Sequence, residues 1–295
     1  MNPQENAKPS PNLTTRRGLR WDTTAVIFLL ALGLLHIPIQ LLSDAPWGDP
    51  ISYRKPILFG ISTGLTLGSL LLLMNELRPR YSDPWIRSLL CISLVIEVLL
   101  ITLQAWRKVP SHFNHSTIQN AAIELGMLIC VLLAVGIILG LTVRTFQSNA
   151  FLKAVPERIV AQRFGMLFLM ISCGIGIGIT LIGYYLLLNG QSPELLGKSG
   201  VLKFPHGSTL HAIQILVLWS WVCAVSGSSH GPASVAWLAT AHLWFLIYSL
   251  RQTLLGMSRW EIDDTGFILI ACTILSVIIS STIAIWPAKN MHRSK

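Results

Sequence analysis

The chain has 295 residues, of which 52% are hydrophobic and 12% are charged. Soluble domains carry about a quarter charged residues, so this composition excludes an ordinary soluble domain and favours a membrane protein. The formal net charge is +9, but no basic face with base-reading groups is visible, so we expect no nucleic-acid partner.

The N-terminal segment differs in composition from the rest of the chain. Residues 1–21 are polar and rich in Pro, Asn and basic side chains, which is typical of a disordered tail. The apolar run that follows is too long for a signal peptide and lacks a small-residue cleavage site. We therefore expect a cytoplasmic tail over 1–21, a helical bundle over 22–288 and a second cytoplasmic tail over 289–295.

Eight apolar runs are each long enough to cross a bilayer, since a helix needs about 20 residues to do so. They cover 24–42, 56–75, 85–105, 119–143, 160–188, 205–226, 233–255 and 265–287. The predicted fold class is all-α, a polytopic integral membrane helical bundle with about eight transmembrane helices.

The Lys and Arg residues of the connecting segments predict the orientation. With the N-terminus inside, about fourteen of them lie inside and about eight outside, which is the bias of a cytoplasmic side. We expect both termini in the cytoplasm and the chain in a bacterial cytoplasmic (inner) membrane. Arg54, Arg107 and Arg251 fall outside, against this bias, so we expect them to have another role.

Small residues recur in three spans at the spacing of close helix contacts. The second span carries Gly60, Gly64 and Gly68, the fourth carries Gly136 and Gly140, and the fifth carries Gly174, Gly176 and Gly178. Glycines four residues apart share one face of a helix and let a neighbouring backbone approach closely. We expect these glycines to pack against other helices.

The loop between the third and fourth spans, residues 104–117, is far too polar to lie in lipid. It contains Gln104, Arg107, His112 and Asn114 within one short turn. The predicted orientation places this loop on the outer side. The sequence therefore predicts a polar pocket that opens on that side.

Several histidines lie at comparable depth on the same side. At 1.5 Å per residue, His36 in the first span and His211 in the sixth both lie roughly 9 Å below the outer boundary. Gln214 is one turn below His211 on the same face, and His206 lies at the outer end of the same span.

Three ionisable residues lie within the spans. Glu97 and His242 fall near the bilayer centre, and Glu124 lies about one turn inside the fourth span. Ionisable groups at such depth are costly, so they usually face the bundle interior and mark a functional path. We interpret Glu97, Glu124 and His242 as a proton path.

The leading functional hypothesis is a haem b or other redox-cofactor site. It needs two neutral imidazoles on different helices at one depth and cations for the propionates. His36 and His211 would be the axial ligands, Arg107 and Arg251 would meet the propionates, and Gln214 would lie beside them.

Three alternatives remain open. The first is a transporter or binder of an anionic small molecule or lipid headgroup, because arginines hold carboxylates and phosphates well. Its binding residues would be Arg54, Gln104, His112, Asn114 and His206. The second is a metal site of His112, His115 and His206, which lacks an assured carboxylate. The third is a non-catalytic structural or assembly subunit. No catalytic motif is present, so no catalytic residue is assigned. The expected partners are membrane lipid, other membrane subunits or a second copy of the chain.

Three stretches carry a resemblance. They are the R-K-P segment at 54–68, the S-H-F-N segment at 104–114 and the P-H…H-x-x-Q segment at 205–214. Together they resemble a group of uncharacterised bacterial polytopic membrane proteins. The resemblance implies that the outer-side residues belong together, and it implies no particular activity.

Overall fold

The computed structural model describes residues 14–43, 46–48, 51–152, 154–196 and 198–285. The predictions for residues 1–13 and 286–295, which include most of both tails, lie outside the described residues. Helix α1 begins at Thr14, so residues 14–21 are helical where we expected a disordered tail. Thr-Thr-Arg-Arg-Gly-Leu-Arg contains no proline to stop the helix there, while the apolar span itself begins at Trp21.

The described chain is helical apart from its loops and one short antiparallel hairpin. Its elements, in chain order, are α1 (Thr14–Leu41), α2 (Arg54–Glu76), α3 (Asp83–Trp106), α4 (Ile118–Thr145), α5 (Pro156–Leu188), β1 (Leu195–Leu196), β2 (Ser199–Gly200), α6 (Lys203–Leu210), α7 (Ala212–Val225), α8 (Gly231–Leu254) and α9 (Asp264–Ile285). Helices α3, α5 and α8 carry proline in the first turn, where its missing N–H has no helical partner to lose.

Within the described residues, 8 helical segments are long and apolar enough to cross a membrane. This confirms the predicted all-helical bundle. The sixth segment, Lys203–Val225, consists of two helices, α6 and α7, which are interrupted at His211. The break was not predicted, because the proline of this span lies near its beginning and not at the interruption.

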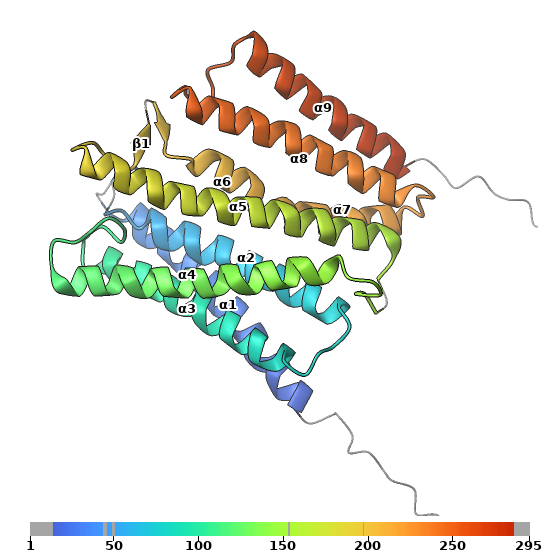
Figure 1. Cartoon of the computed structure of the whole chain (residues 1–295), viewed down its shortest axis with the longest axis horizontal. Helices are drawn as coiled ribbons and strands as arrows, with labels where there is room; N and C mark the ends of the chain where they lie inside the picture. The colour runs from blue at the N-terminus through green and yellow to red at the C-terminus, as the bar shows by residue number, and fades with distance from the viewer. Residues whose placement is uncertain (1–13, 44–45, 49–50, 153, 197, 286–295) are drawn as a thin grey trace, which may run out of the picture.

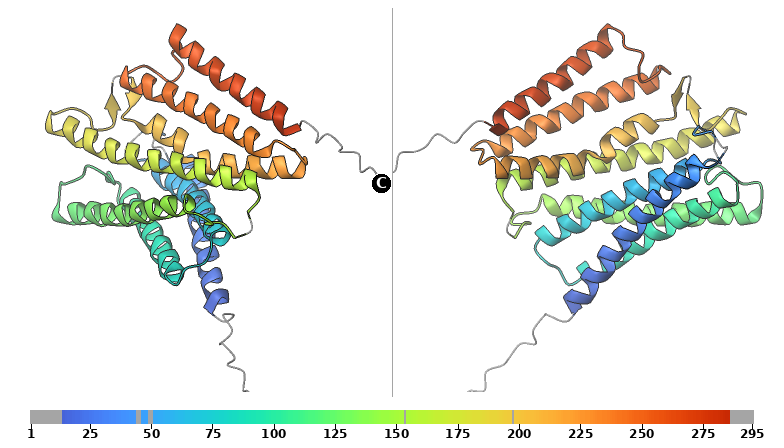
Figure 2. Two further views of the ribbon diagram at one scale, coloured as in Figure 1. Left: turned by 45° about the vertical axis from the view of Figure 1, so that its right-hand side comes forward. Right: turned by 180° about the vertical axis from the view of Figure 1, so that it is seen from behind.

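The helices form two groups (Figure 1). Helices α1 to α4 make the first half, in which α1 packs on α2 and α3, and α3 packs on α2 and α4. Helices α5 to α9 make the second half, in which α8 packs on α9, and α5 packs on α6, α7 and α8. Both views in Figure 2 show the first half as a separate layer below the second. The halves meet where α2 contacts α7 and where α4 contacts α5.

We name the two ends of the bundle by what they carry. The hairpin end, at the left of Figure 1, holds β1 and β2, the 104–117 loop and the beginnings of α2 and α6. The termini end, at the right, holds the beginning of α1 and the end of α9. The Lys and Arg distribution predicts that the termini end is cytoplasmic.

Close glycine contacts tighten each half. A Cβ atom added to Gly60 of α2 would come within 2.7 Å of the Cα atom of Gly33 on α1, and one added to Gly64 would meet Leu30 at 2.9 Å. In the second half, a Cβ atom on Gly165 of α5 would lie 2.9 Å from the Cα atom of Ile213 on α7. Larger residues at these positions would separate the helices, as expected for glycine-mediated packing.

Candidate functional site

His36 of α1 is held by hydrogen bonds on both ring nitrogens. Its Nδ1 lies 2.7 Å from the carbonyl oxygen of Leu32. Its Nε2 accepts from the indole N–H of Trp106 at 3.0 Å. Because indole can only donate, Nδ1 must carry the proton, and neither nitrogen has a lone pair free for iron. The arrangement of His36 therefore does not fit an axial haem ligand, and haem binding stays a prediction without support from this geometry.

The other proposed haem residues also have different surroundings. Arg251 at the end of α8 forms a two-point ion pair with Asp263, with N–O distances of 2.9 and 2.6 Å. Arg107 bonds to Gln104 Oε1 at 2.6 Å and to Asn120 Oδ1 at 2.9 Å. Both guanidiniums are thus bonded to side chains other than His211.

The 104–117 loop is a network of mutually satisfied polar groups. Asn120 donates to Ser116 Oγ at 3.0 Å while its Oδ1 accepts from Arg107. Glu124 Oε1 and Oε2 accept from the backbone N–H groups of Phe113 and Asn114 at 2.9 and 3.0 Å. No buried side-chain nitrogen or oxygen of this loop lacks a partner among the described residues.

Phe113 anchors the loop to the second half. It has a positive φ of 58°, and its ring packs edge-on to Tyr184 at 5.1 Å between centroids. A Cβ atom added to Gly183 would lie 2.3 Å from Phe113 Cζ, so any larger residue there would have to displace the Phe113 ring. Tyr184 also donates to Glu124 Oε1 at 2.6 Å. Side-chain contacts of this loop therefore hold α4 against α5, and the Glu124 carboxylate accepts one of the hydrogen bonds between these helices.

The three histidines of the metal hypothesis are directed to different partners. His112 Nδ1 lies 2.9 Å from Ser111 Oγ, and His115 contacts Tyr184 and Glu124. His206 Nδ1 lies 2.9 Å from the carbonyl oxygen of Ser172. Among the described residues, no group of three or more metal-binding side chains comes together, so this hypothesis is wrong.

The two deep ionisable residues lie in different halves. Glu97 of α3 is 6% exposed and makes no hydrogen bond to a described residue. His242 of α8 bonds through Nδ1 to the carbonyl oxygen of Leu238 at 3.0 Å and packs against Phe168. A continuous proton path through Glu97, Glu124 and His242 stays a prediction.

A group of charged residues lies at the hairpin end, where α2 and α6 begin. Glu194, which precedes β1, bridges Lys55 of α2 at 3.3 Å and Lys203 of α6 at 3.0 Å. Partial burial raises the pKa of the Glu194 carboxyl, but the two lysines outweigh it and hold the pKa below its usual value. Arg54, half-buried beside Lys55, has no ion pair with a described residue. The cluster therefore carries an excess of positive charge.

His112 lies next to this cluster and is kept neutral. Desolvation and the nearby Lys55 ammonium lower the pKa of His112 to about 4. The imidazole also packs near Phe59 of α2, with 6.2 Å between ring centroids. At neutral pH His112 thus offers a neutral polar group beside the lysines, without adding to their charge.

Halfway along the bundle, a second polar group lies at the break between α6 and α7. Gln214 Nε2 lies 3.5 Å from Thr66 Oγ1 on α2, a long contact that crosses between the halves. Gln214 Oε1 is buried and has no partner among the described residues. His211, at the break itself, is half-buried and makes no side-chain hydrogen bond to a described residue. A buried acceptor without a partner costs about 1–3 kcal/mol, so its presence requires an explanation.

A third contact between the halves lies at the termini end. Glu76 at the end of α2 pairs with Arg158 of α5 at 3.4 Å and accepts from Gln162 Nε2 at 3.1 Å. Arg158 Nε and Gln162 Oε1 are buried without partners. A hollow of about 240 Å³ borders this contact.

Helix α2 thus carries one polar contact to the second half at each of three depths. Lys55 lies at the hairpin end, Thr66 about 17 Å further along the axis, and Glu76 about 15 Å beyond Thr66, at 1.5 Å per residue. Five residues of these contacts were not predicted from the sequence: Thr66, Glu76, Arg158, Gln162 and Glu194. The spacing of Arg158 and Gln162, which places both on one face of a helix, was the available signal.

In the part of the chain that the structure describes, eight helical segments are long and apolar enough to cross a membrane, and they pack as two halves. This arrangement defines a multi-pass helical membrane protein. Comparison of the chain with protein-family models, with curated proteins and with solved structures finds no match. The resemblance to bacterial polytopic membrane proteins therefore stays a prediction.

Proposed function

We propose that the protein is a transporter of small anionic molecules that works by alternating access between its two halves. It would lie in a bacterial cytoplasmic membrane with the termini end inside. The observation that carries the proposal is the buried, unpartnered Oε1 of Gln214, which lies between the halves at a helix break. Transporters commonly bind substrate near the bilayer centre, beside interrupted helices.

The contacts above and below Gln214 suit two gates. Lys55–Glu194 joins the halves at the hairpin end, and Glu76–Arg158 joins them at the termini end. Each is an ion pair between side chains far apart in the sequence, and each closes a different side of the central group. Opening one pair while the other stays closed would expose Thr66, His211 and Gln214 to one side at a time.

The charges favour an anionic substrate. Arg54, Lys55 and Lys203 outnumber Glu194 at the hairpin end, and such an excess raises the local concentration of anions. The central group contains a hydroxyl, an imidazole and an amide, which can donate hydrogen bonds to a carboxylate or phosphate. In the closed state the Glu194 carboxylate pairs with Lys55 and Lys203. When that gate opens, a substrate carboxylate would take its place beside the lysines.

The test measures accessibility at the central group. The five cysteines would be replaced by alanine, and Thr66→Cys would be labelled with a membrane-impermeant maleimide from either side of oriented vesicles. Glu194→Gln should speed labelling from the hairpin end about fivefold or more, because losing about 1 kcal/mol of closing contacts shifts the equilibrium by that factor. Glu76→Gln should do the same from the termini end.

A matched control uses an ion pair of the hairpin end that does not join the halves. Lys198–Glu261 is exposed and lies within the second half, with 3.1 Å between its charged atoms. Glu261→Gln should leave labelling at position 66 unchanged. Unchanged labelling from both sides in both gate variants would contradict alternating access and favour a structural subunit.

A further inference from the structure

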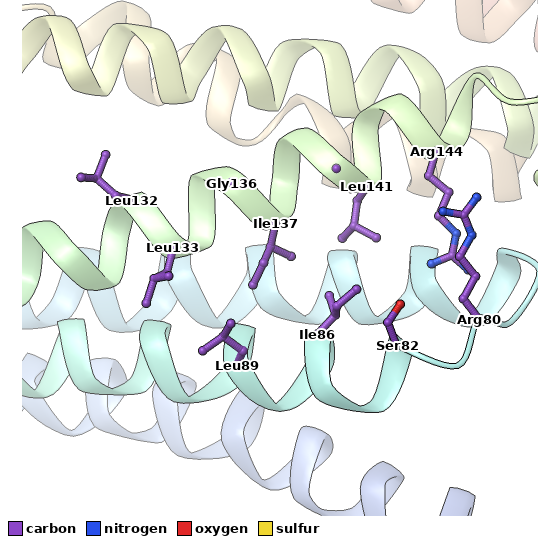
Figure 3. Close-up of a pocket in the computed structure, with 11 residues that line it drawn as sticks. Arg80, Ser82, Ile86, Leu89, Leu132, Leu133, Gly136, Ile137, Leu141 and Arg144 are labelled. Carbon is purple, nitrogen blue, oxygen red and sulfur yellow. The ribbon is translucent and has the colours of Figure 1, made fainter.

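A groove lies between α3 and α4, on the side of the bundle nearer the termini end. Its volume is about 450 Å³. Figure 3 shows Ile86 and Leu89 of α3 facing Leu133 and Ile137 of α4 across it. The groove belongs to the first half alone and does not touch the interface between the halves.

Two glycines of α4 form the floor of this groove. A Cβ atom added to Gly136 or Gly140 would meet no atom within 4 Å. We expected these glycines to pack against another helix. That prediction is wrong for them and for Gly174 of α5, unlike the prediction for Gly60 and Gly64. The exposed backbone of Gly136 and Gly140 leaves a channel along the helix that no described part of this chain fills.

The groove is apolar along its length and basic at one end. Arg80 and Arg144 lie together at that end (Figure 3). Arg144 is buried and bonds to both carboxylate oxygens of Asp83, at 2.6 and 3.0 Å. Arg80 bonds through its guanidinium to the neutral side chain of Gln147 and forms no ion pair with a described residue. Two arginines against one aspartate leave a net positive charge.

Other side chains at this end suit a membrane interface. Ser82 is exposed and its side chain makes no capping hydrogen bond. Tyr81 is 97% exposed and Trp85 is 77% exposed. Tyr and Trp gather where acyl chains meet headgroups, so the basic end lies at headgroup level and the apolar walls lie among acyl chains.

We infer that this groove binds an anionic phospholipid of the leaflet at the termini end. One acyl chain lies over Gly136 and Gly140, between the apolar walls. The phosphate lies beside Arg80 and accepts from its guanidinium and from the Ser82 hydroxyl. A lipid fits better than a helix of a second copy, because the floor is flanked by walls from two helices and ends in an unpaired charge. The cytoplasmic leaflet, to which the basic loops assign this end, is the anionic one.

The experiment compares two lipids on the purified full-length chain. Native mass spectrometry would measure retention of phosphatidylglycerol and of phosphatidylcholine with the same acyl chains. Arg80→Gln should weaken phosphatidylglycerol binding about fivefold, the effect of one charge near a membrane surface. It should weaken phosphatidylcholine binding less, because the choline ammonium offsets the charge of that phosphate. Gly140→Leu should reduce binding of both lipids, because the side chain fills the groove.

Two control variants match these changes. Arg259→Gln removes an exposed arginine at the hairpin end, and Gly174→Leu fills open space on α5. Neither should alter lipid retention. Unchanged phosphatidylglycerol binding in both Arg80→Gln and Gly140→Leu would overturn the inference. So would a dimer that Gly140→Leu dissociates without any change in lipid binding, because a second copy would then be the occupant.

Discussion

The 104–117 loop and the interface between the two halves show opposite relations between polarity and hydrogen bonding. The loop is dense in polar groups, and Arg107, Asn120 and Glu124 satisfy one another and the backbone. The interface is sparse in polar groups, yet Gln214, Gln162 and Arg158 each keep a buried atom without a partner. The density of polar residues therefore does not by itself mark a binding site. Unsatisfied atoms in a confined place are the stronger signal.

The first prediction concerns the contact between the 104–117 loop and α5, and it has the largest expected effect. Gly183→Leu should lower the free energy of unfolding by about 3 kcal/mol, because the new side chain displaces Phe113 from α5. Thermal unfolding in detergent would measure the loss. On the same helix, a Cβ atom added to Gly174 meets no atom within 4 Å, so Gly174→Leu should change stability little. Equal losses in the two variants would mean that Phe113 does not anchor the loop.

The second prediction concerns Gln214 at the interface between the two halves. Gln214→Leu should raise the free energy of unfolding by about 1 kcal/mol, because it removes a buried acceptor without a partner. The same variant should abolish uptake into proteoliposomes of any active probe from a panel of acetate, succinate and phosphate. A gain in stability together with a loss of transport is the pattern of a site built for a ligand.

Gln252 provides the comparison for this variant. It also has a buried Oε1 without a partner, but its amide nitrogen bonds to Tyr248 within the second half. Gln252→Leu should leave uptake intact wherever the protein remains folded. Loss of stability in Gln214→Leu, with uptake retained, would contradict the assignment of Gln214 to a binding site.

The third prediction concerns pH at the border of the two regions. His112 has a pKa lowered to about 4 in the folded protein, against 6.5 ordinarily. Its neutral form therefore stabilises the fold fully above pH 6.5, and this contribution is lost as the pH falls from 6.5 towards 4. The melting temperature should drop between pH 7 and pH 5, and less so in His112→Gln. An identical drop in both proteins would assign the effect to other groups.

The number and character of the helices followed from the sequence because hydrophobic length is a local property. The eight apolar runs of the sequence correspond to the eight spans found among the described residues, and the glycines of the second span contact α1. The location of the site could not be predicted from the sequence in the same way. His36 and His211 matched in depth, but depth does not specify which side of a helix a residue faces or which nitrogen is already bonded. Trp106, which donates to His36 Nε2, lies 70 residues away in the sequence, and no local pattern joins the two.

What the sequence determined by itself was a bundle of membrane-spanning helices and the side on which its basic residues accumulate. Tertiary structure alone decided which polar groups meet. Lys55 and Glu194 are 139 residues apart, and Thr66 and Gln214 are 148 residues apart. Hydropathy is fixed residue by residue along the chain, whereas the partner of a buried polar atom depends on how whole helices pack. For that reason the membrane class could be predicted from composition, whereas the unpartnered groups between the halves could not be predicted.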